Sequence, residues 1–241
     1  MEGRKLKIGL FTDCHYCNGV LGGGRDSKAS FEKTRIAMEE FKKQGVDICF
    51  CLGDLTDNSP EDTKETVSEC FINITRLVRS YGIPYYLVPG NHDYLIVKAD
   101  ELVKLIDFKL PPYTVKTEVC NFIILDANYR SDMRRFDIAG VDWTDSNLPP
   151  EQVEFLKREL DGSDKDCIVL VHENLDPNVQ YMHIIKNSEQ IRNIIKESGK
   201  VRMVIQGHFH EGAERIIDST PYLTLPAMCE HKENYFKIIE I

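Results

Sequence analysis

The chain has 241 residues, of which 42% are hydrophobic and 29% charged, and its formal net charge is −9. This composition is typical of a globular protein and excludes a disordered chain. The acidic balance argues against a nucleic acid polymer as a partner, because phosphate contacts require a basic face. The longest apolar runs, such as residues 120–125, are far shorter than the roughly 20 residues that span a bilayer. No signal-peptide pattern precedes the first strand-like run, so we expect a cytoplasmic protein without a membrane partner.

The first half of the chain alternates short apolar runs with longer amphipathic stretches. In chain order we predict a strand at 6–11, a helix at 27–43, a strand at 48–52, a helix at 61–80, a strand at 84–88 and a helix at 99–106. The helices carry apolar residues on one face at helical spacing. This βαβαβ order predicts parallel strands joined by crossover helices.

The pattern changes after Pro111 and Pro112, where strands become more frequent. Residues 113–118 and 121–126 predict a hairpin, and 149–160 a helix with two prolines near its start and Glu151 in its first turn. Further strands are predicted at 167–171, 201–206, 213–217, 222–225 and 235–241. Neither a repeat nor an interdomain linker is evident. We therefore predict one α/β domain over residues 1–241, with two facing mixed sheets and helices outside.

Eight cysteines occur in the chain, several of them inside apolar strand-like runs, where a free thiol acts as a small hydrophobic group. Cys14 and Cys17 form a C-x-x-C pair, which has zinc and redox interpretations. A zinc site would need a second such pair, and the sequence contains none. We therefore predict reduced, structural cysteines, as a cytosolic protein would have.

Residues of the types that commonly bind metal ions follow five of the predicted apolar strands. The motifs are Asp13-Cys14-His15, Gly53-Asp54-Leu55-Thr56-Asp57, Gly90-Asn91-His92-Asp93, His172 after Val171, and Gly207-His208-Phe209-His210. In open α/β sheets, ligands bind beyond the carboxyl ends of the strands, so five such ends can point at one crevice. Of the seven histidines in the chain, five lie in these motifs.

The spacing within the motifs has a geometric interpretation. In an extended segment, residues i and i+2 lie on one side, so Asp13 and His15 would face one ion, and His208 and His210 likewise. Taken singly, D-x-H and Gly-Asp are explained by solvated side chains and ordinary turns. G-N-H-D and G-H-x-H are more specific, because a turn requires Gly-Asn but not the His-Asp after it. In this order, the motifs together predict a metal centre.

The ordered motifs resemble those of the calcineurin-like metallophosphoesterase family, from Asp13 to His210 and so over most of the chain. The resemblance implies a four-layer αββα sandwich of two mixed β-sheets flanked by helices. It also implies a phosphoric ester hydrolase with two di- or trivalent transition-metal ions in its active site. Mixed nitrogen and oxygen ligands favour manganese, iron or zinc over calcium.

The resemblance further assigns roles by position. Asp54 would bridge the two ions. Asp13, His15 and His210 would hold one ion, and Asn91, His172 and His208 the other. A hydroxide between the ions, formed because metals lower the pKa of bound water towards neutrality, would attack phosphorus. His92 would stabilise the transition state or protonate the leaving alkoxide, and Asp57 would orient His92. A purely local alternative makes Asp57 a residue at the start of a helix.

One motif departs from the family pattern, which usually has a proline two residues after the fourth-motif histidine. In this chain His172 is followed by Glu173-Asn174-Leu175-Asp176, and the proline is displaced to Pro177. His172 still ends an apolar strand and is kept as a ligand. The shape of the loop beside it, and with it part of the substrate pocket, is not predicted.

Several other segments have two interpretations each. The glycine-rich loop 18–25 lacks the Gly-Lys-Ser/Thr ending of a P-loop, so it is either a lid whose Arg25 meets a phosphate or a solvated connection. Arginine suits bidentate phosphate contacts, but surface charge is the commoner explanation of the later arginines. These are Arg130, Arg134 and Arg135. His183 is predicted to be structural, and His231, in a late loop, is predicted not to reach the site.

The preferred function is hydrolysis of a small phosphorylated compound, which is a phosphodiester, a nucleotide pyrophosphate or a phosphomonoester. A nuclease of the same family is the alternative among enzymes, and the acidic balance disfavours it. A scaffold that has lost catalysis is the alternative outside enzymes. Retention of His92 and of all the predicted ligands argues against the scaffold. The oligomeric state is left open.

Overall fold

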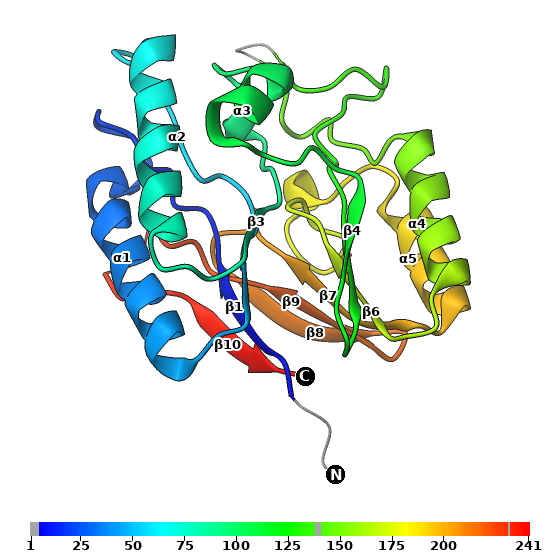
Figure 1. Ribbon diagram of the computed structural model, residues 1–241. Helices are drawn as coiled ribbons and strands as arrows, with labels where there is room; N and C mark the ends of the chain where they lie inside the picture. Colours follow the sequence, from blue (N-terminus) through cyan, green and yellow to red (C-terminus); the bar gives the residue numbers. More distant parts are fainter. Residues whose placement is uncertain (1–4, 138–140, 231) are drawn as a thin grey trace.

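A four-stranded sheet with the order β10–β1–β2–β3 forms one half of the protein (Figure 1). Strands β1 (Lys7–Phe11), β2 (Ile48–Cys51) and β3 (Tyr85–Leu87) are parallel, as the βαβαβ order predicts. Strand β10 (Lys237–Glu240) pairs antiparallel with β1 and brings the end of the chain beside its beginning. The computed structural model describes residues 5–137, 141–230 and 232–241.

Helices α1 (Ser27–Gln44), α2 (Lys64–Arg79) and α3 (Ala99–Ile106) pack on the outer face of this sheet. Helix α2 begins three residues later than the predicted 61, because Thr63 is its N-cap and accepts a hydrogen bond from the Thr66 amide. This cap satisfies an amide that would otherwise lack a partner in the first turn.

The second sheet has six strands in the order β4–β5–β6–β7–β9–β8. Its two edge pairs are antiparallel and its central strands are parallel, so it is mixed like the first. The predicted hairpin is confirmed as β4 and β5. The strands are β4 (Tyr113–Lys116), β5 (Asn121–Ile124), β6 (Cys167–Leu170), β7 (Val201–Gln206), β8 (Ala213–Ile217) and β9 (Thr220–Thr224).

Two helices, α4 (Pro150–Gly162) and α5 (Ser188–Ser198), cover the outer face of the second sheet. Helix α5 is absent from the elements predicted from the sequence. Its signals are present but weak: Ile191 and Ile195 are the buried pair on its inner face, and Gly199 ends it in a left-handed conformation. Two short 3₁₀ helices, η1 (His92–Tyr94) and η2 (Tyr181–His183), lie in the loops that follow the strands.

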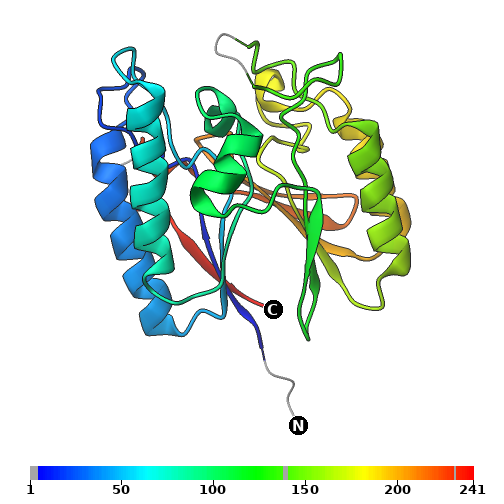
Figure 2. The same cartoon turned by 45° about the horizontal axis from the view of Figure 1, so that its top comes forward.

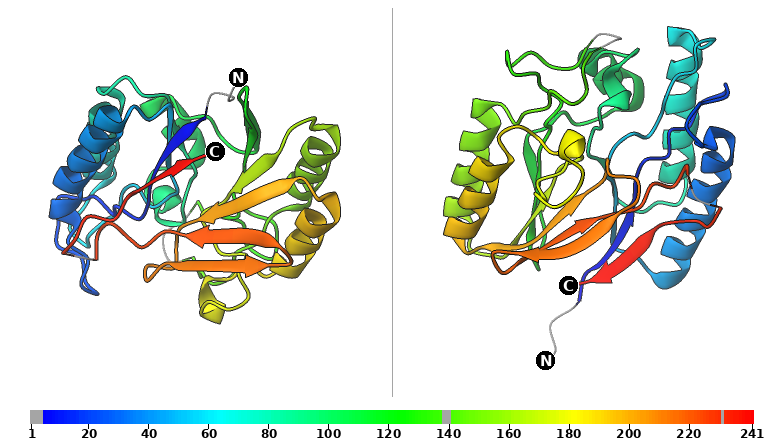
Figure 3. Two further views of the ribbon diagram at one scale, coloured as in Figure 1. Left: turned by 90° about the horizontal axis from the view of Figure 1, so that it is seen from below. Right: turned by 180° about the vertical axis from the view of Figure 1, so that it is seen from behind.

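Three buried apolar clusters separate four layers, which confirms the predicted αββα sandwich (Figures 2 and 3). One cluster lies between the two sheets, where the rings of Phe50 and Phe122 are 4.8 Å apart. The other two join each sheet to its helices. In the described part of the chain, no helix combines the length and apolar content needed to cross a bilayer.

All eight cysteines are buried free thiols. The Cys14 sulfur lies 3.8 Å from the Met228 sulfur and 3.7 Å from the Thr34 hydroxyl. The Cys17 sulfur faces the Gly19 carbonyl. The C-x-x-C pair therefore packs into the protein as two separate thiols.

Candidate metal centre

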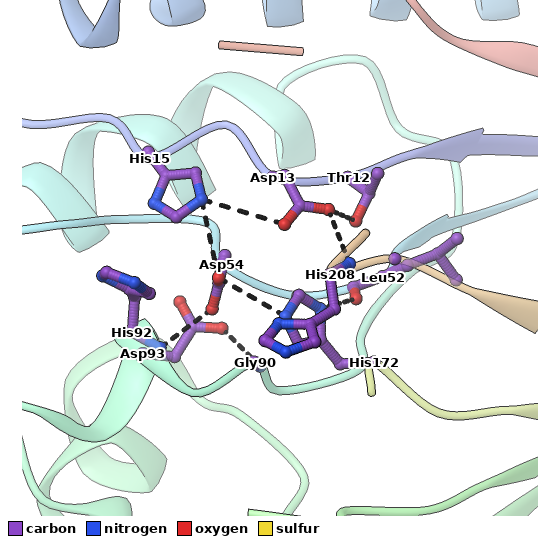
Figure 4. A network of polar contacts seen from close by, with 12 residues as sticks. Thr12, Asp13, His15, Leu52, Asp54, Gly90, His92, Asp93, His172 and His208 are labelled. Atoms are coloured by element: carbon purple, nitrogen blue, oxygen red, sulfur yellow. Dashed lines mark hydrogen bonds and ion pairs between the residues drawn. The ribbon is translucent and has the colours of Figure 1, made fainter. Parts of the chain in front are cut away.

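The loops that follow β1, β2, β3, β6 and β7 bring predicted ligands to one place. Figure 4 shows Asp13, His15, Asp54, His172 and His208 there. Four groups of three His, Cys, Asp or Glu side chains in the described chain have potential ligand atoms within 4.8 Å of one another, and two of these groups share Asp54. Asp13, His15 and Asp54 form one group, and Asp54, His172 and His208 form the other. Asp54 belongs to both groups.

The backbone at these positions is strained rather than extended. Four of the predicted ligands have a positive φ, namely Asp13 at 50°, His15 at 46°, Asp54 at 49° and His208 at 66°. Asp13 and His15 therefore do not lie in the extended segment that the D-x-H spacing predicted. Non-glycine residues in the left-handed region cost about 1–3 kcal/mol each and cluster at functional sites. The left-handed backbone conformation of Asp13 and His15, rather than the alternation of an extended strand, directs their side chains to a common point.

Asp54 lies at the centre of the site, with its two carboxylate oxygens in different roles. Oδ1 accepts a hydrogen bond of 2.9 Å from the His92 amide. Oδ2 lies 3.5 Å from His15 Nε2 and 3.4 Å from His172 Nε2. Burial opposes ionisation, but the surrounding histidines, His172 foremost, hold the pKa of Asp54 well below its usual value. An ionised oxygen between two imidazoles is suited to bridging two cations.

The first group is completed by His210. Asp13 Oδ2 is occupied, because it accepts from the Thr12 hydroxyl at 2.5 Å and from the His208 amide at 3.1 Å. Asp13 Oδ1 makes no hydrogen bond and lies 3.2 Å from His210 Nε2 and 3.8 Å from His15 Nε2. The two imidazole nitrogens are themselves 3.3 Å apart. Three ligand atoms therefore converge beside Asp54.

The second group presents imidazole nitrogens that could bind metal. His172 Nδ1 donates a 2.6 Å hydrogen bond to the Leu52 carbonyl, which can only accept, so Nε2, the atom that faces Asp54, is the nitrogen left for a metal ion. Burial opposes the charged form of His172, but Asp54 and Asp13 raise its pKa well above the usual value, so a metal ion would displace the proton from Nε2. Burial, with His172 nearby, lowers the pKa of His208 well below its usual value, so His208 is neutral.

Four buried atoms of the predicted ligands make no hydrogen bond within the described residues: Asp13 Oδ1, Asn91 Oδ1, His172 Nε2 and His208 Nε2. A buried acceptor without a partner costs about 1–3 kcal/mol. Three of these atoms belong to the two groups around Asp54, and the fourth belongs to Asn91, which lines the pocket beside them. Such a set of imidazole, carboxylate and amide donors fits transition-metal ions.

Glycines allow the motif loops to approach one another closely. A Cβ at Gly90 would lie 2.2 Å from Asp54 Oδ1 and 2.5 Å from the Asp54 amide nitrogen. A Cβ at Gly207 would lie 2.3 Å from the Thr12 hydroxyl. Gly53, with φ of 109°, has both a left-handed backbone and a crowded neighbour, His172 Nδ1. Close packing of backbone on ligand, more than turn geometry, explains Gly90 and Gly207.

Asp57 connects two imidazoles and a guanidinium. Its Oδ2 accepts from His15 Nδ1 at 2.9 Å and from Arg25 at 2.7 Å, and its Oδ1 accepts from His92 Nδ1 at 2.8 Å. The alternative that places Asp57 at the start of a helix is wrong, because α2 begins after Thr63. Burial opposes ionisation, but the hydrogen bonds from His15 and His92 keep the pKa of Asp57 low.

Two buried polar residues in the motifs received no role from the sequence. Asp93 accepts from the Gly90 amide at 2.9 Å and from the Leu55 amide at 2.9 Å, and thereby ties the second motif loop to the third. Asn174 stands where the family usually has proline. Its amide donates to the Gly207 carbonyl at 2.8 Å, and its oxygen accepts from Gln206. Cross-links of this kind fix the loop beside His172 without the proline.

A pocket of about 270 Å³ lies over the two groups. Its lining includes Arg25 and Gly23 from the glycine-rich loop, so this loop is more than a solvated connection. His183 also lines it, although the sequence predicts a purely structural residue. Other lining residues that the sequence did not indicate are Trp143 and Glu230, whose carboxylate accepts from His210 Nδ1.

The later arginines have other partners. Arg130 and Arg134 pair with Asp132, and Arg135 pairs with the buried Asp126 at 3.1 Å. The pocket's described lining includes none of the three. His231 lies outside the described residues.

The αββα fold with paired Asp and His clusters at its strand ends places the chain in the class of metal-dependent hydrolases. More specifically, a family model described as calcineurin-like phosphoesterase matches residues 6–212, and the chain belongs to that family.

Curated relatives align over nearly the whole chain. A 3',5'-cyclic-nucleotide phosphodiesterase of Nostoc sp. is 24% identical over 233 residues, which cover 95% of this chain and 80% of that protein. The 3',5'-cyclic adenosine monophosphate phosphodiesterase of Haemophilus influenzae is 21% identical over 210 residues, covering 86% and 69%. A crystal structure of a dimetal phosphatase from Danio rerio superposes with a TM-score of 0.83 at 15% identity, covering 97% and 91%. The structural match supports the fold.

Proposed function

We propose that this chain hydrolyses small phosphodiesters with the help of two transition-metal ions. The observation that carries the proposal is the placement of His92. Its imidazole lines the pocket, Asp57 holds its Nδ1, and its backbone amide donates to Asp54, the residue shared by both ligand groups. A proton donor is thus fixed beside the place where two cations would meet.

Seven side chains would hold the two ions. Their nitrogen and oxygen ligand atoms suit manganese, iron or zinc. Asp13, His15 and His210 form one set, Asn91, His172 and His208 the other, and Asp54 serves both. When bound, the ions supply positive charge for the phosphoryl oxygens and lower the pKa of water towards neutrality. The chain's own part is to bring these donors together and to leave Asp13 Oδ1, Asn91 Oδ1, His172 Nε2 and His208 Nε2 without a competing hydrogen bond in the described residues.

His92 would protonate the leaving oxygen. Asp57 accepts from Nδ1, so this nitrogen carries a proton and Nε2 is the atom left for the substrate. Proton transfer from a positioned imidazole contributes about 10²–10⁴-fold to a rate. Asp57 acts through His92 and is a positioning residue.

The size of the pocket favours a small ester. Its volume of about 270 Å³ is just below the roughly 300 Å³ at which the usual range for ligand sites begins. Arg25 is the one arginine or lysine among its lining residues in the described chain, and it is already paired with Asp57. The two curated relatives are named as cyclic-nucleotide phosphodiesterases, and this supports a phosphodiester as the substrate.

A substrate panel with added manganese, iron or zinc tests the proposal. The panel contains bis-p-nitrophenyl phosphate, p-nitrophenyl phosphate, 3',5'-cyclic AMP, ADP-ribose and single-stranded DNA. We expect the largest kcat/KM for a small diester. Product release from DNA alone would indicate a nuclease, and an intact panel in metal-saturated protein would exclude phosphoesterase activity.

His92→Ala tests the assigned residue. We expect turnover of the best substrate to fall by about 10²–10⁴-fold, while elemental analysis finds the metal content of the wild type. Arg134→Ala is the control, because the Arg134 side chain is 79% exposed and lies away from the pocket. Unchanged turnover in His92→Ala would remove His92 from the reaction.

A further inference from the structure

Trp143, the only tryptophan of the chain, lines the same pocket as His92 and Arg25. Its side chain is half-buried, so part of the ring is accessible from the pocket. The remaining lining is dominated by ionisable side chains. The indole therefore offers an apolar aromatic contact that the ionisable side chains around it do not provide.

A turn holds Trp143 in place. The Asp142 carboxylate accepts from the Thr144 amide at 3.0 Å and from the Thr144 hydroxyl at 2.7 Å. The Asp145 amide donates to the Asp142 carbonyl at 3.1 Å, and the Asp145 carboxylate accepts from the Ser131 amide at 3.0 Å. These bonds define the turn around the indole, and the Asp145–Ser131 bond ties the turn to another segment of the chain.

The indole is also braced by other rings. The centroid of Trp143 lies 5.3 Å from that of His183, with the planes tilted by 44°. It lies 5.3 Å from that of His208, with a perpendicular, edge-on geometry of 76°. His183 in turn packs on Phe209 at 5.4 Å. Rings at these separations stabilise one another in defined orientations, so the wall formed by Trp143 and His183 is rigid.

We propose that Trp143 is a stacking platform for a nucleobase, which makes a nucleoside phosphate ester the substrate class of this site. This inference rests on the proposed function, because the phosphate end of the ligand would occupy the ligand groups around Asp54. Aromatic side chains stack on any base through its π-face and need no hydrogen bonds to recognise it. The platform would thus select nucleotides over simple alkyl esters without selecting one base.

Fluorescence of the single tryptophan reports on this contact directly. Zinc-loaded protein is titrated with AMP and with ribose 5-phosphate, which carries the same phosphate and sugar without the base. Calorimetry measures binding of both compounds. We expect AMP to quench the emission saturably and bound ribose 5-phosphate to leave it unchanged. Equal quenching by both compounds, or none by bound AMP, would overturn the inference.

Substitutions separate stacking from a packing role. In Trp143→Ala we expect the KM for 3',5'-cyclic AMP to rise on the order of tenfold, with kcat, metal content and the affinity for ribose 5-phosphate unchanged. Trp143→Phe should retain most of the wild-type KM. Tyr181→Ala is the control, because Tyr181 is a nearby aromatic residue that is 76% exposed and outside the pocket lining.

The outcomes distinguish the two proposals. Loss of metal in Trp143→Ala, or an equal loss of affinity for AMP and ribose 5-phosphate, would assign Trp143 to support of His208 and overturn the platform. Cleavage of a small diester would leave the proposed function standing in that case. If metal-loaded protein cleaved no diester and bound neither compound, the proposed function and the platform would both fail.

Discussion

At the scale of single residues, Asp57 links a proposed metal ligand, the proposed acid and the arginine of the glycine-rich loop. Its two oxygens accept from His15, His92 and Arg25. A carboxylate can accept all three hydrogen bonds because it has no proton of its own. Asp57 therefore couples the orientation of a proposed ligand to that of the proposed acid.

Asp57→Asn keeps the size of the side chain but replaces one acceptor oxygen with a donor. One imidazole must then lose its partner or change its tautomer. We expect metal affinity or turnover to fall by about 10–100-fold, measured by metal titration and steady-state kinetics. Asp62→Asn is the control, because the Asp62 carboxylate accepts hydrogen bonds from the Ser59 amide and hydroxyl in the same loop. Wild-type values for both quantities in Asp57→Asn would contradict the role given to Asp57.

Gly90 illustrates a steric requirement of the site. Its Cβ would meet the Asp54 backbone as well as the side chain, so rotation of a side chain cannot relieve the clash. We expect Gly90→Ala to lose about 1–3 kcal/mol of unfolding free energy and to bind metal more weakly. Denaturant unfolding and elemental analysis measure the two effects. Gly22→Ala, where a Cβ meets nothing within 4 Å, should match the wild type; equal behaviour of the two variants would refute the steric argument.

At the scale of secondary-structure elements, the cysteines show how strands and helices use small apolar groups. Cys49 and Cys51 lie in β2 and Cys70 lies in α2, all of them buried. Burial raises the pKa of Cys70 to about 11. A thiol that is both covered and protonated is a poor nucleophile, because the thiolate is the reactive form.

We therefore expect Ellman's reagent to react slowly with the native protein near neutral pH. After addition of denaturant, the same reagent should titrate all eight thiols, because none is in a disulfide. The denatured sample is the control, because it shows that the reagent can react with every thiol once the thiols are exposed. Rapid reaction of several thiols in the native protein would show that these elements open readily.

At the scale of the whole molecule, the site depends on the contact between the two sheets. Asp13 and Asp54 follow strands of the first sheet, whereas His172 and His208 follow strands of the second. The apolar cluster around Phe50 and Phe122 holds the sheets together. Loosening this cluster would move one half of the site against the other.

Phe122→Ala is expected to cost about 3–5 kcal/mol of unfolding free energy, because it leaves a cavity between fully buried neighbours. Phe122→Leu should cost less and remain folded, with weaker metal binding if the sheets shift. Denaturant unfolding followed by circular dichroism measures both. Ile216→Ala, at a position that is 76% exposed, should change stability by less than about 0.5 kcal/mol. A similar small change in Phe122→Ala would show that this contact does not hold the sheets.

Local sequence patterns were sufficient for most elements and for the residues at the strand ends. Helix α2 and the β4–β5 hairpin follow from periodicity and from turn residues, which act over a few positions. Helix α5 was missed because only Ile191 and Ile195 mark its buried core face. The pocket-lining residues Trp143, His183 and Glu230 were missed for another reason: their function depends on distant neighbours rather than on adjacent residues.

By itself, the sequence determined which chemical groups end the strands, in what order, and that these strands belong to a layered α/β fold. Only the tertiary structure decided that Asp54 Oδ2 lies between His15 and His172 and that Trp143 forms a wall of the pocket. The physical reason is the distance along the chain between the residues that interact. Strand and helix patterns arise from contacts between near neighbours in the chain, whereas the site arises from the packing of two sheets whose residues are far apart in the sequence.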